Sequence, residues 1–191
     1  MSHSRYILRN PEQVAVLGSA VRLQIADLLS SEGEASVPEL ARRLGRSPES
    51  LYYHVRKLAE VGIVEVAGER RVRTGFEAVY RLVAPEIRID PKERSRPYLH
   101  ALARCCAAML RQTSRDYRRS IEGGGAVLEG ESRDVALRRH TVRLDPEGLA
   151  KLNSLLEEIP HVLREHESTN GGQSFALTFV LTPLPEKKPE A

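Results

Sequence analysis

The sequence has no apolar run that approaches the roughly 20 residues of a membrane span, and its N-terminus has no apolar signal core. It has only two cysteines, Cys105 and Cys106, and because these are neighbours a disulfide bond between them would need strained geometry. Both features favour a cytoplasmic protein with reduced thiols and no membrane association. A content of 41% hydrophobic and 29% charged residues is typical of globular proteins.

Motifs that carry catalysis are also missing. The sequence contains no Gly-rich phosphate loop, no serine elbow and no paired-carboxylate motif. His161 and His166 are five residues apart, so they do not share one face of a helix. Two adjacent cysteines alone do not complete a tetrahedral metal site. We therefore expect a protein that is not an enzyme and that holds no cofactor and no metal ion.

Residues 36–66, in contrast, contain several residues that are typical of the beginnings and ends of helices. Ser36 and Glu39 have the spacing of a capping box, which starts a helix, and Gly45 is suited to end that helix in a left-handed conformation. Ser47 then offers an N-cap for a second helix. The stretch therefore predicts two short helices joined by a tight turn.

The second of these helices, predicted at residues 47–61, has apolar residues three and four positions apart, which places them in a stripe on one face of the helix. Earlier helices are predicted at 11–17 and at about 20–30, whereas residues 1–10 are expected to be loosely packed. The stripe of the 47–61 helix consists of Leu51, Val55 and Leu58.

An alternating pattern after residue 62 predicts a β-hairpin. Residues 63–67 and 76–83 are its strands. Residues 68–75 are its tip, which is long for a two-residue turn and is therefore expected to be a bulged or mobile loop. Helices followed by such a hairpin describe a winged helix-turn-helix, with a three-helix core and a hairpin wing, which we predict for residues 1–84 of an α+β protein.

The distribution of charge favours nucleic acid as a partner. The net charge is only +3, but residues 42–73 contain eight Arg and Lys residues against four Glu. Because a helix fits the major groove, the 47–61 helix is the candidate for base contacts, and the 68–75 wing is the candidate for contacts with the minor groove or backbone. The residues predicted to contact double-stranded DNA are Ser47, Glu49, Ser50, Tyr52, Tyr53, His54, Arg56, Lys57, Arg70, Arg71 and Arg73.

After residue 84 the pattern changes. We expect a linker at 85–97, a small α+β domain at 98–182 and a disordered tail at 183–191. The apolar seams on the two helices of this domain need partners, so we predict that it forms a homodimer, and a pocket for a small-molecule effector is a compatible alternative. Its expected elements, in order, are a helix at 98–121, a strand at 134–144, a helix from 146 to about 163 with a kink or break near Pro160, and a strand at 175–181.

Several short patterns occur along residues 20–82. They are Arg22 before an Ile-x-x-Leu-Leu helix, Glu39-Leu40-Ala41, Leu44-Gly45, the 47–58 helix with His54, and Gly62-Ile63-Val64. With these patterns, residues 20–82 resemble the winged helix-turn-helix of ArsR-type bacterial and archaeal transcriptional regulators. The resemblance implies a homodimer that reads a two-fold related operator, usually as a repressor. Metal-sensing members carry a Cys-x-Cys pair near the helix at 36–44, which this sequence lacks, so metal sensing is not implied.

Two other functions also fit the residues. Glu49 and Glu60 on the outer face of the 47–61 helix favour a protein-interaction module slightly, because a carboxylate repels phosphate. Cys105 and Cys106, with His100 one turn earlier, fit a thiol or metal sensor. The same two cysteines also suit a buried helix stripe as small apolar residues.

Overall fold

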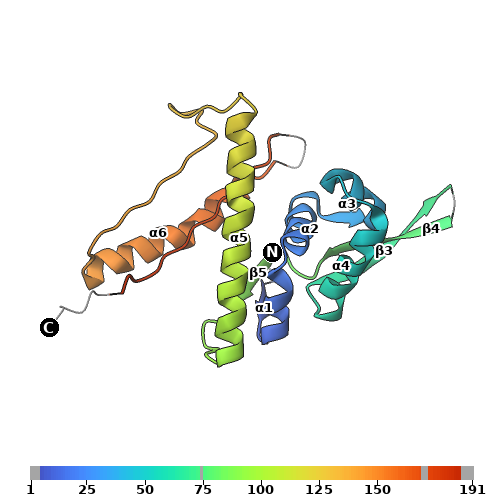
Figure 1. Cartoon of the computed structure of the whole chain (residues 1–191), viewed down its shortest axis with the longest axis horizontal. Coiled ribbons are helices and arrows are strands. Elements are labelled where there is room, and N and C mark those ends of the chain that lie inside the picture. The colour runs from blue at the N-terminus through green and yellow to red at the C-terminus, as the bar shows by residue number, and fades with distance from the viewer. Residues whose placement is uncertain (1–4, 74, 169–171, 186–191) are drawn as a thin grey trace. The chain divides into compact units, whose positions relative to one another are not determined.

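The computed structural model describes residues 5–73, 75–168 and 172–185, and the chain divides into two compact units. Unit 1 contains Met1–Arg118 and Leu177–Ala191, and unit 2 contains Arg119–Ala176. Thr74 of the predicted wing and residues 186–191 of the predicted tail lie outside the described residues. In chain order the elements are β1 (Arg5–Leu8), α1 (Pro11–Leu17), α2 (Ala20–Glu32), β2 (Glu34–Ser36), α3 (Val37–Leu44), α4 (Pro48–Glu60), β3 (Val64–Val72), β4 (Gly75–Leu82), β5 (Glu86–Ile89), α5 (Arg96–Glu122) and α6 (Pro146–Glu165) (Figure 1).

Three helices of unit 1, α2, α3 and α4, bury their inner faces in one core. Ile25 of α2 and Leu40 of α3 are completely buried there. Full burial of a side chain of this size stabilises a fold by about 1.5–3 kcal/mol, so this core fixes which face of α4 remains outside. The stripe predicted for α4 is confirmed, with Leu51, Val55 and Leu58 all buried.

Helix α3 has both predicted end signals, the capping box and the glycine stop, whereas α4 has the predicted N-cap residue without its side-chain hydrogen bond. The Ser36 hydroxyl accepts a hydrogen bond from the Glu39 amide at 3.4 Å, and the Glu39 carboxylate accepts one from the Ser36 amide at 2.8 Å, so the capping box is formed. Gly45 ends α3 with a left-handed φ of 61°. Ser47 is the N-cap residue of α4, but its side chain makes no capping hydrogen bond, contrary to the prediction.

The hairpin formed by β3 and β4 is paired further toward its tip than the sequence predicted, and its register shifts once, between Val66 and Gly68. The two strands pair antiparallel, and β2 pairs with the other edge of β4. The predicted tip at 68–75 is therefore mostly strand, with Arg70 opposite Glu77 and Val72 opposite Gly75. Backbone pairing with β4 holds this charged segment extended, although charged residues are not strong strand formers. The hairpin projects away from the three helices (Figure 1).

Two segments that the sequence predicted to be loose form a second sheet. Strand β1, within the expected loose N-terminus, pairs in parallel with β5, within the expected linker at 85–97. An ion pair of 2.9 Å between Arg5 and Glu86 lies on this sheet. Both expectations were wrong for these residues because the pairing partner lies far away along the chain, where local patterns do not reach.

Tyr98 joins the beginning of α5 to this second sheet. Its side chain is completely buried, and its hydroxyl donates a hydrogen bond to the Leu8 carbonyl at 2.7 Å and accepts one from the Asp90 amide at 2.8 Å. Ala101 and Ala108 of α5 are buried in the core of unit 1. The division between the units consequently falls inside α5 and not in the expected linker.

Helix α6 lies in unit 2 and begins where the sequence predicted, with the Asp145 carboxylate accepting a hydrogen bond from the Gly148 amide at 2.7 Å. The helix continues through Pro160, so the expected break is not formed. The order helix, strand, helix, strand is also wrong for the described chain. Residues 134–144 and 175–181 form no strand, because neither segment pairs with a strand among the described residues.

The carboxyl group of Asp27 on α2 provides a pH-dependent prediction. Burial, with a smaller contribution from Asp116, raises its pKa to about 6, although part of the residue is exposed to solvent. The folded state therefore binds more protons than the unfolded state between pH 3.8 and about 6, so stability falls as pH rises through this interval.

We expect Asp27→Asn to raise the free energy of unfolding at pH 7.5 by about 1 kcal/mol, a value reduced for the solvent exposure of the residue. Below pH 4 the gain should vanish, because the carboxyl group is then neutral in both states. Urea unfolding at the two pH values measures this difference. Glu129→Gln removes an exposed charge and should change neither value by more than about 0.5 kcal/mol. Equal gains at both pH values for Asp27→Asn would contradict the assignment.

Candidate nucleic-acid interface

The predicted helix contacts lie on the outer face and flanks of α4, away from its buried stripe. Tyr53, near the middle of this face, is 50% exposed. Of the eight residues predicted on α4 and at its N-cap, six are exposed and two are half-buried. Ser47, Glu49, Ser50, Tyr52, Tyr53 and Arg56 are exposed, and His54 and Lys57 are half-buried.

Tyr53 is surrounded by groups that carry or can carry positive charge. The Arg56 guanidinium and the Lys57 ammonium each lie 6.0 Å from the centre of its ring, at the outer limit of a cation–π contact. The His54 ring meets it edge-on at a centroid distance of 5.3 Å. An exposed ring between two cations can accept a stacked base or bind a phosphate through its hydroxyl.

Glu60 partly neutralises the two cations of α4. Its carboxylate lies 2.6 Å from the Lys57 ammonium and 3.5 Å from Arg56 Nε. The hydrogen bond from Lys57 is the main cause of the lowered pKa of Glu60. Exposed pairs of this kind contribute little to stability, so an incoming phosphate can replace Glu60 as the partner of either cation.

The arginines of the hairpin divide into two kinds. Arg70 Nη1 lies 2.5 Å from the Glu39 carboxylate, which also closes the capping box of α3. The capping hydrogen bond from the Ser36 amide and, to a smaller extent, Arg70 lower the pKa of Glu39. Arg70 therefore ties the hairpin to α3. Arg71 and Arg73 are exposed and form no ion pair with a described residue.

His54 lies at the edge of the core, and two arginines that the site prediction left out lie near it. Its Nδ1 is buried without a hydrogen-bond partner in the described part of the chain. Burial, then the charges of Arg22 and Arg46, lower the pKa of His54, which favours the neutral ring. Arg22 also donates a hydrogen bond to the Val16 carbonyl at 2.5 Å. The position of Arg46, just before the N-cap of α4, is the sequence signal that would have added it to the site.

Helices α3 and α4 are joined by a short turn, and α4 exposes a polar face. A comparison with known protein families agrees with this arrangement. The matching family model is described as a helix-turn-helix domain and covers residues 17–67. Residues 17–67 form a helix-turn-helix domain. This domain includes α2, α3, α4 and the first residues of β3, and it supports a DNA-binding regulator. No curated protein matches the chain.

Among the described residues, no group of three or more His, Cys, Asp or Glu side chains is arranged to hold a metal ion. None of the described helices is alone long and apolar enough to cross a membrane. Helices α1 and α2 together have the length and composition, but they are bent by 90° where they meet.

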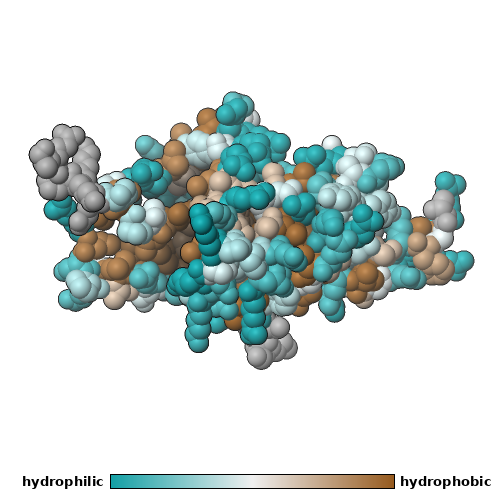
Figure 2. Space-filling model, turned by 60° about the horizontal axis from the view of Figure 1, so that its bottom comes forward, coloured by the Kyte–Doolittle hydropathy of each residue, from teal (hydrophilic) through white to brown (hydrophobic). Residues whose placement is uncertain are grey.

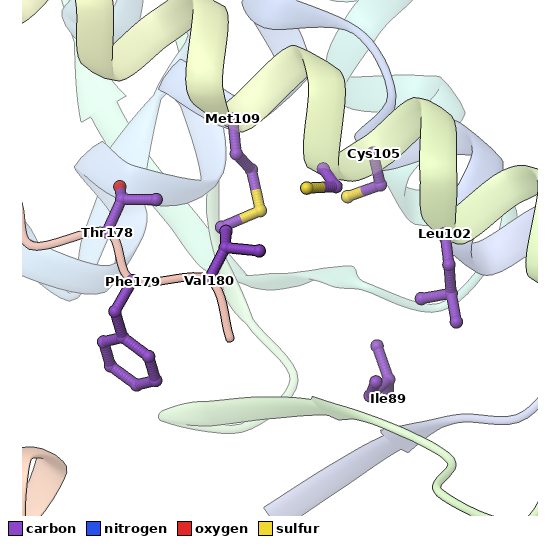
Figure 3. Close-up of a pocket in the computed structure, with 8 residues that line it drawn as sticks. Ile89, Leu102, Cys105, Met109, Thr178, Phe179 and Val180 are labelled. Atoms are coloured by element: carbon purple, nitrogen blue, oxygen red, sulfur yellow. The ribbon is translucent and has the colours of Figure 1, made fainter. Parts of the chain in front are cut away.

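Unit 1 also contains an apolar pocket of about 190 Å³, formed by α5, β5 and residues 178–180. Leu102, Cys105 and Met109 extend from α5 toward Ile89 and Val180 (Figure 3). Burial, with a contribution from the adjacent Cys106, raises the pKa of the Cys105 thiol. The thiolate is the reactive form of cysteine, so this position is unfavourable for a redox sensor.

Proposed function

We propose that the protein is a sequence-specific DNA-binding transcriptional regulator, of the ArsR-type class and acting in the cytoplasm as a homodimeric repressor rather than as an enzyme. The observation that carries the proposal is the outer face of α4, where Tyr53, Arg56 and Lys57 are presented together by a helix-turn-helix domain. The arginine-bearing hairpin follows α4 directly and supports the same function.

In this proposal α4 enters the major groove and the hairpin acts as the wing. Arg56 and Lys57 exchange Glu60 for phosphate or guanine, and Tyr53 contacts a phosphate or a base. Arg71 and Arg73 reach the minor groove or the backbone. Arg70, held by Glu39, sets the direction of the hairpin and adds positive charge. Ser47 and Ser50 lie at the N-terminus of α4, where amide groups favour a phosphate.

Selection of bound sites from random double-stranded DNA, performed with the full chain, tests the function. We expect enrichment of one two-fold related sequence with half-sites about one helical turn apart, roughly 34 Å, because each copy presents one α4. Binding to the enriched site should exceed binding to scrambled DNA by at least about 1,000-fold at physiological salt. Failure to enrich any sequence would reject sequence-specific binding and favour a protein-interaction module.

The ion pairs of Glu60 with Arg56 and Lys57 predict a mutation that strengthens DNA binding, whereas most interface mutations weaken it. Glu60→Gln should tighten DNA binding by about threefold to tenfold, because it removes a negative charge near phosphate and releases Arg56 and Lys57. Fluorescence anisotropy with the selected site measures the dissociation constant.

Glu65→Gln is the matched control, since it releases Arg81 from a comparable exposed ion pair of 2.8 Å outside the proposed interface. It should change affinity by less than twofold. Weaker binding by Glu60→Gln, or equal tightening by both variants, would show that the outer face of α4 does not approach phosphate.

A further inference from the structure

Helix α6 has an apolar seam but no core of its own. None of its 20 residues is buried, and Leu163 at the end of the seam is 52% exposed. An amphipathic helix in a folded protein owes most of its stability to packing of its apolar face against a partner. Leu152, Leu156 and Ile159 are half-buried, so the described residues cover this seam only in part.

Two extended segments are similarly incomplete. Residues 136–144 and 172–185 make no backbone–backbone hydrogen bond with any described residue. Apolar side chains alternate along the second segment, and Phe175 and Leu177 are 66% and 58% exposed. Extended chain with unpaired backbone groups and an apolar face is a template for strand pairing. Exposed apolar side chains are visible in several places on the face drawn in Figure 2.

The charges in this region complement each other in a way that a second copy can use. Residues 133–144 contain four arginines and one acidic residue, whereas residues 146–167 contain five glutamates against one lysine and one arginine. In a two-fold interface every contact occurs twice, so the basic segment of each copy can face the acidic helix of the other. The same pattern argues against an acidic partner such as nucleic acid or an anionic membrane covering α6.

We propose that a second copy of the chain covers the α6 seam, and that residues 136–144 and 173–182 become strands by pairing across the two copies. The inference rests on the homodimer of the proposed function and names the surface that forms it. It also accounts for the contradiction between the sequence, which predicts strands at these positions, and the single chain, in which they have no partner.

Leu156→Glu places a charge in the seam, and Ser154→Glu places the same charge on the opposite side of α6 as the matched control. Sedimentation of the full chain should show a dimer for the wild type and for Ser154→Glu. Leu156→Glu should raise the dimer dissociation constant at least 100-fold. A monomeric wild type at micromolar concentration, or equal effects of the two variants, would overturn the proposal.

Hydrogen exchange tests the strands separately. Amides of 136–144 and 173–182 should be protected in the wild-type dimer and lose that protection in Leu156→Glu, while the amides of α4 keep theirs because α4 belongs to unit 1. Ala176→Pro removes a backbone donor and should weaken the dimer at least tenfold, whereas Glu131→Pro, in a turn closed by the Arg133 amide and the Gly130 carbonyl, should not. Unprotected segments in a stable dimer would also overturn the proposal.

DNA binding separates failure of this inference from failure of the proposed function. A wild-type dimer that ignores DNA would reject the regulator and leave the interface intact. A monomer that binds single half-sites specifically would reject the interface and leave DNA binding intact.

Discussion

Replacing Arg70, Arg71 and Arg73 together with alanine is expected to weaken DNA binding by roughly 100-fold near 0.1 M salt. Each loss contributes about 1 kcal/mol, from the DNA contacts of Arg71 and Arg73 and from the charge and hairpin direction that Arg70 provides. The slope of log affinity against log salt should become less steep by about 2 to 3, because fewer counterions are released. Anisotropy titrations with the selected site at several salt concentrations measure both quantities.

A control variant with the same change of net charge shows whether the loss of affinity is specific to the wing. Arg104, Arg111 and Arg118 are exposed on α5, and their triple alanine variant should lose less than about threefold in affinity. Loss of the same size in both variants would mean that the hairpin contributes only overall charge.

Single substitutions should separate the two kinds of hairpin arginine. Arg71→Ala and Arg73→Ala should reduce affinity without changing stability, because neither side chain has an ion pair with a described residue. Arg70→Ala should also lower the free energy of unfolding by up to about 1 kcal/mol, since it breaks the exposed pair with Glu39. A larger loss of stability from Arg71→Ala than from Arg70→Ala would contradict this division.

Tyr98→Ala is expected to lower the free energy of unfolding of unit 1 by about 3–5 kcal/mol, mainly because it leaves a cavity in the core. Total stability of a domain is only about 5–15 kcal/mol, so much of the DNA-binding activity at 37 °C should be lost as well. Tyr98 is completely buried and serves both the Leu8 carbonyl and the Asp90 amide. Urea unfolding followed by circular dichroism measures the effect.

Tyr98→Phe divides this effect into packing and hydrogen bonding. It keeps the ring but removes the hydrogen bonds of the hydroxyl to the Leu8 carbonyl and from the Asp90 amide. These two backbone groups keep their own hydrogen bond of 3.2 Å, so the expected cost is only about 0.5–1.5 kcal/mol. Tyr52→Ala removes the same side chain from an exposed position on α4 and should change stability by less than about 1 kcal/mol. If Tyr98→Phe has no effect, the hydroxyl does not hold α5 to the second sheet.

The hairpin shows how far local patterns predicted the candidate site. Alternation placed strands on both sides of residues 68–75, and the three arginines were recognised as a basic group. The pairing of Arg70 with Glu39 was out of reach, because these residues are 31 positions apart and meet only when the hairpin folds back on α3. For the same reason, the sequence pattern grouped Arg70 with Arg71 and Arg73 as predicted DNA contacts.

The sequence alone determined the helix pair and the face that α4 presents. The capping box at Ser36 and Glu39, the stop at Gly45 and the stripe through Leu51 all involve residues within one or two turns of each other, so the chemistry is readable from neighbours. Only the tertiary structure decided which segments become strands. A strand needs a partner, and β1 finds β5 far along the chain, whereas residues 136–144 and 173–182 find no partner strand within the described chain. Backbone pairing is a property of two segments together, and the pattern within either segment does not say where the other one is.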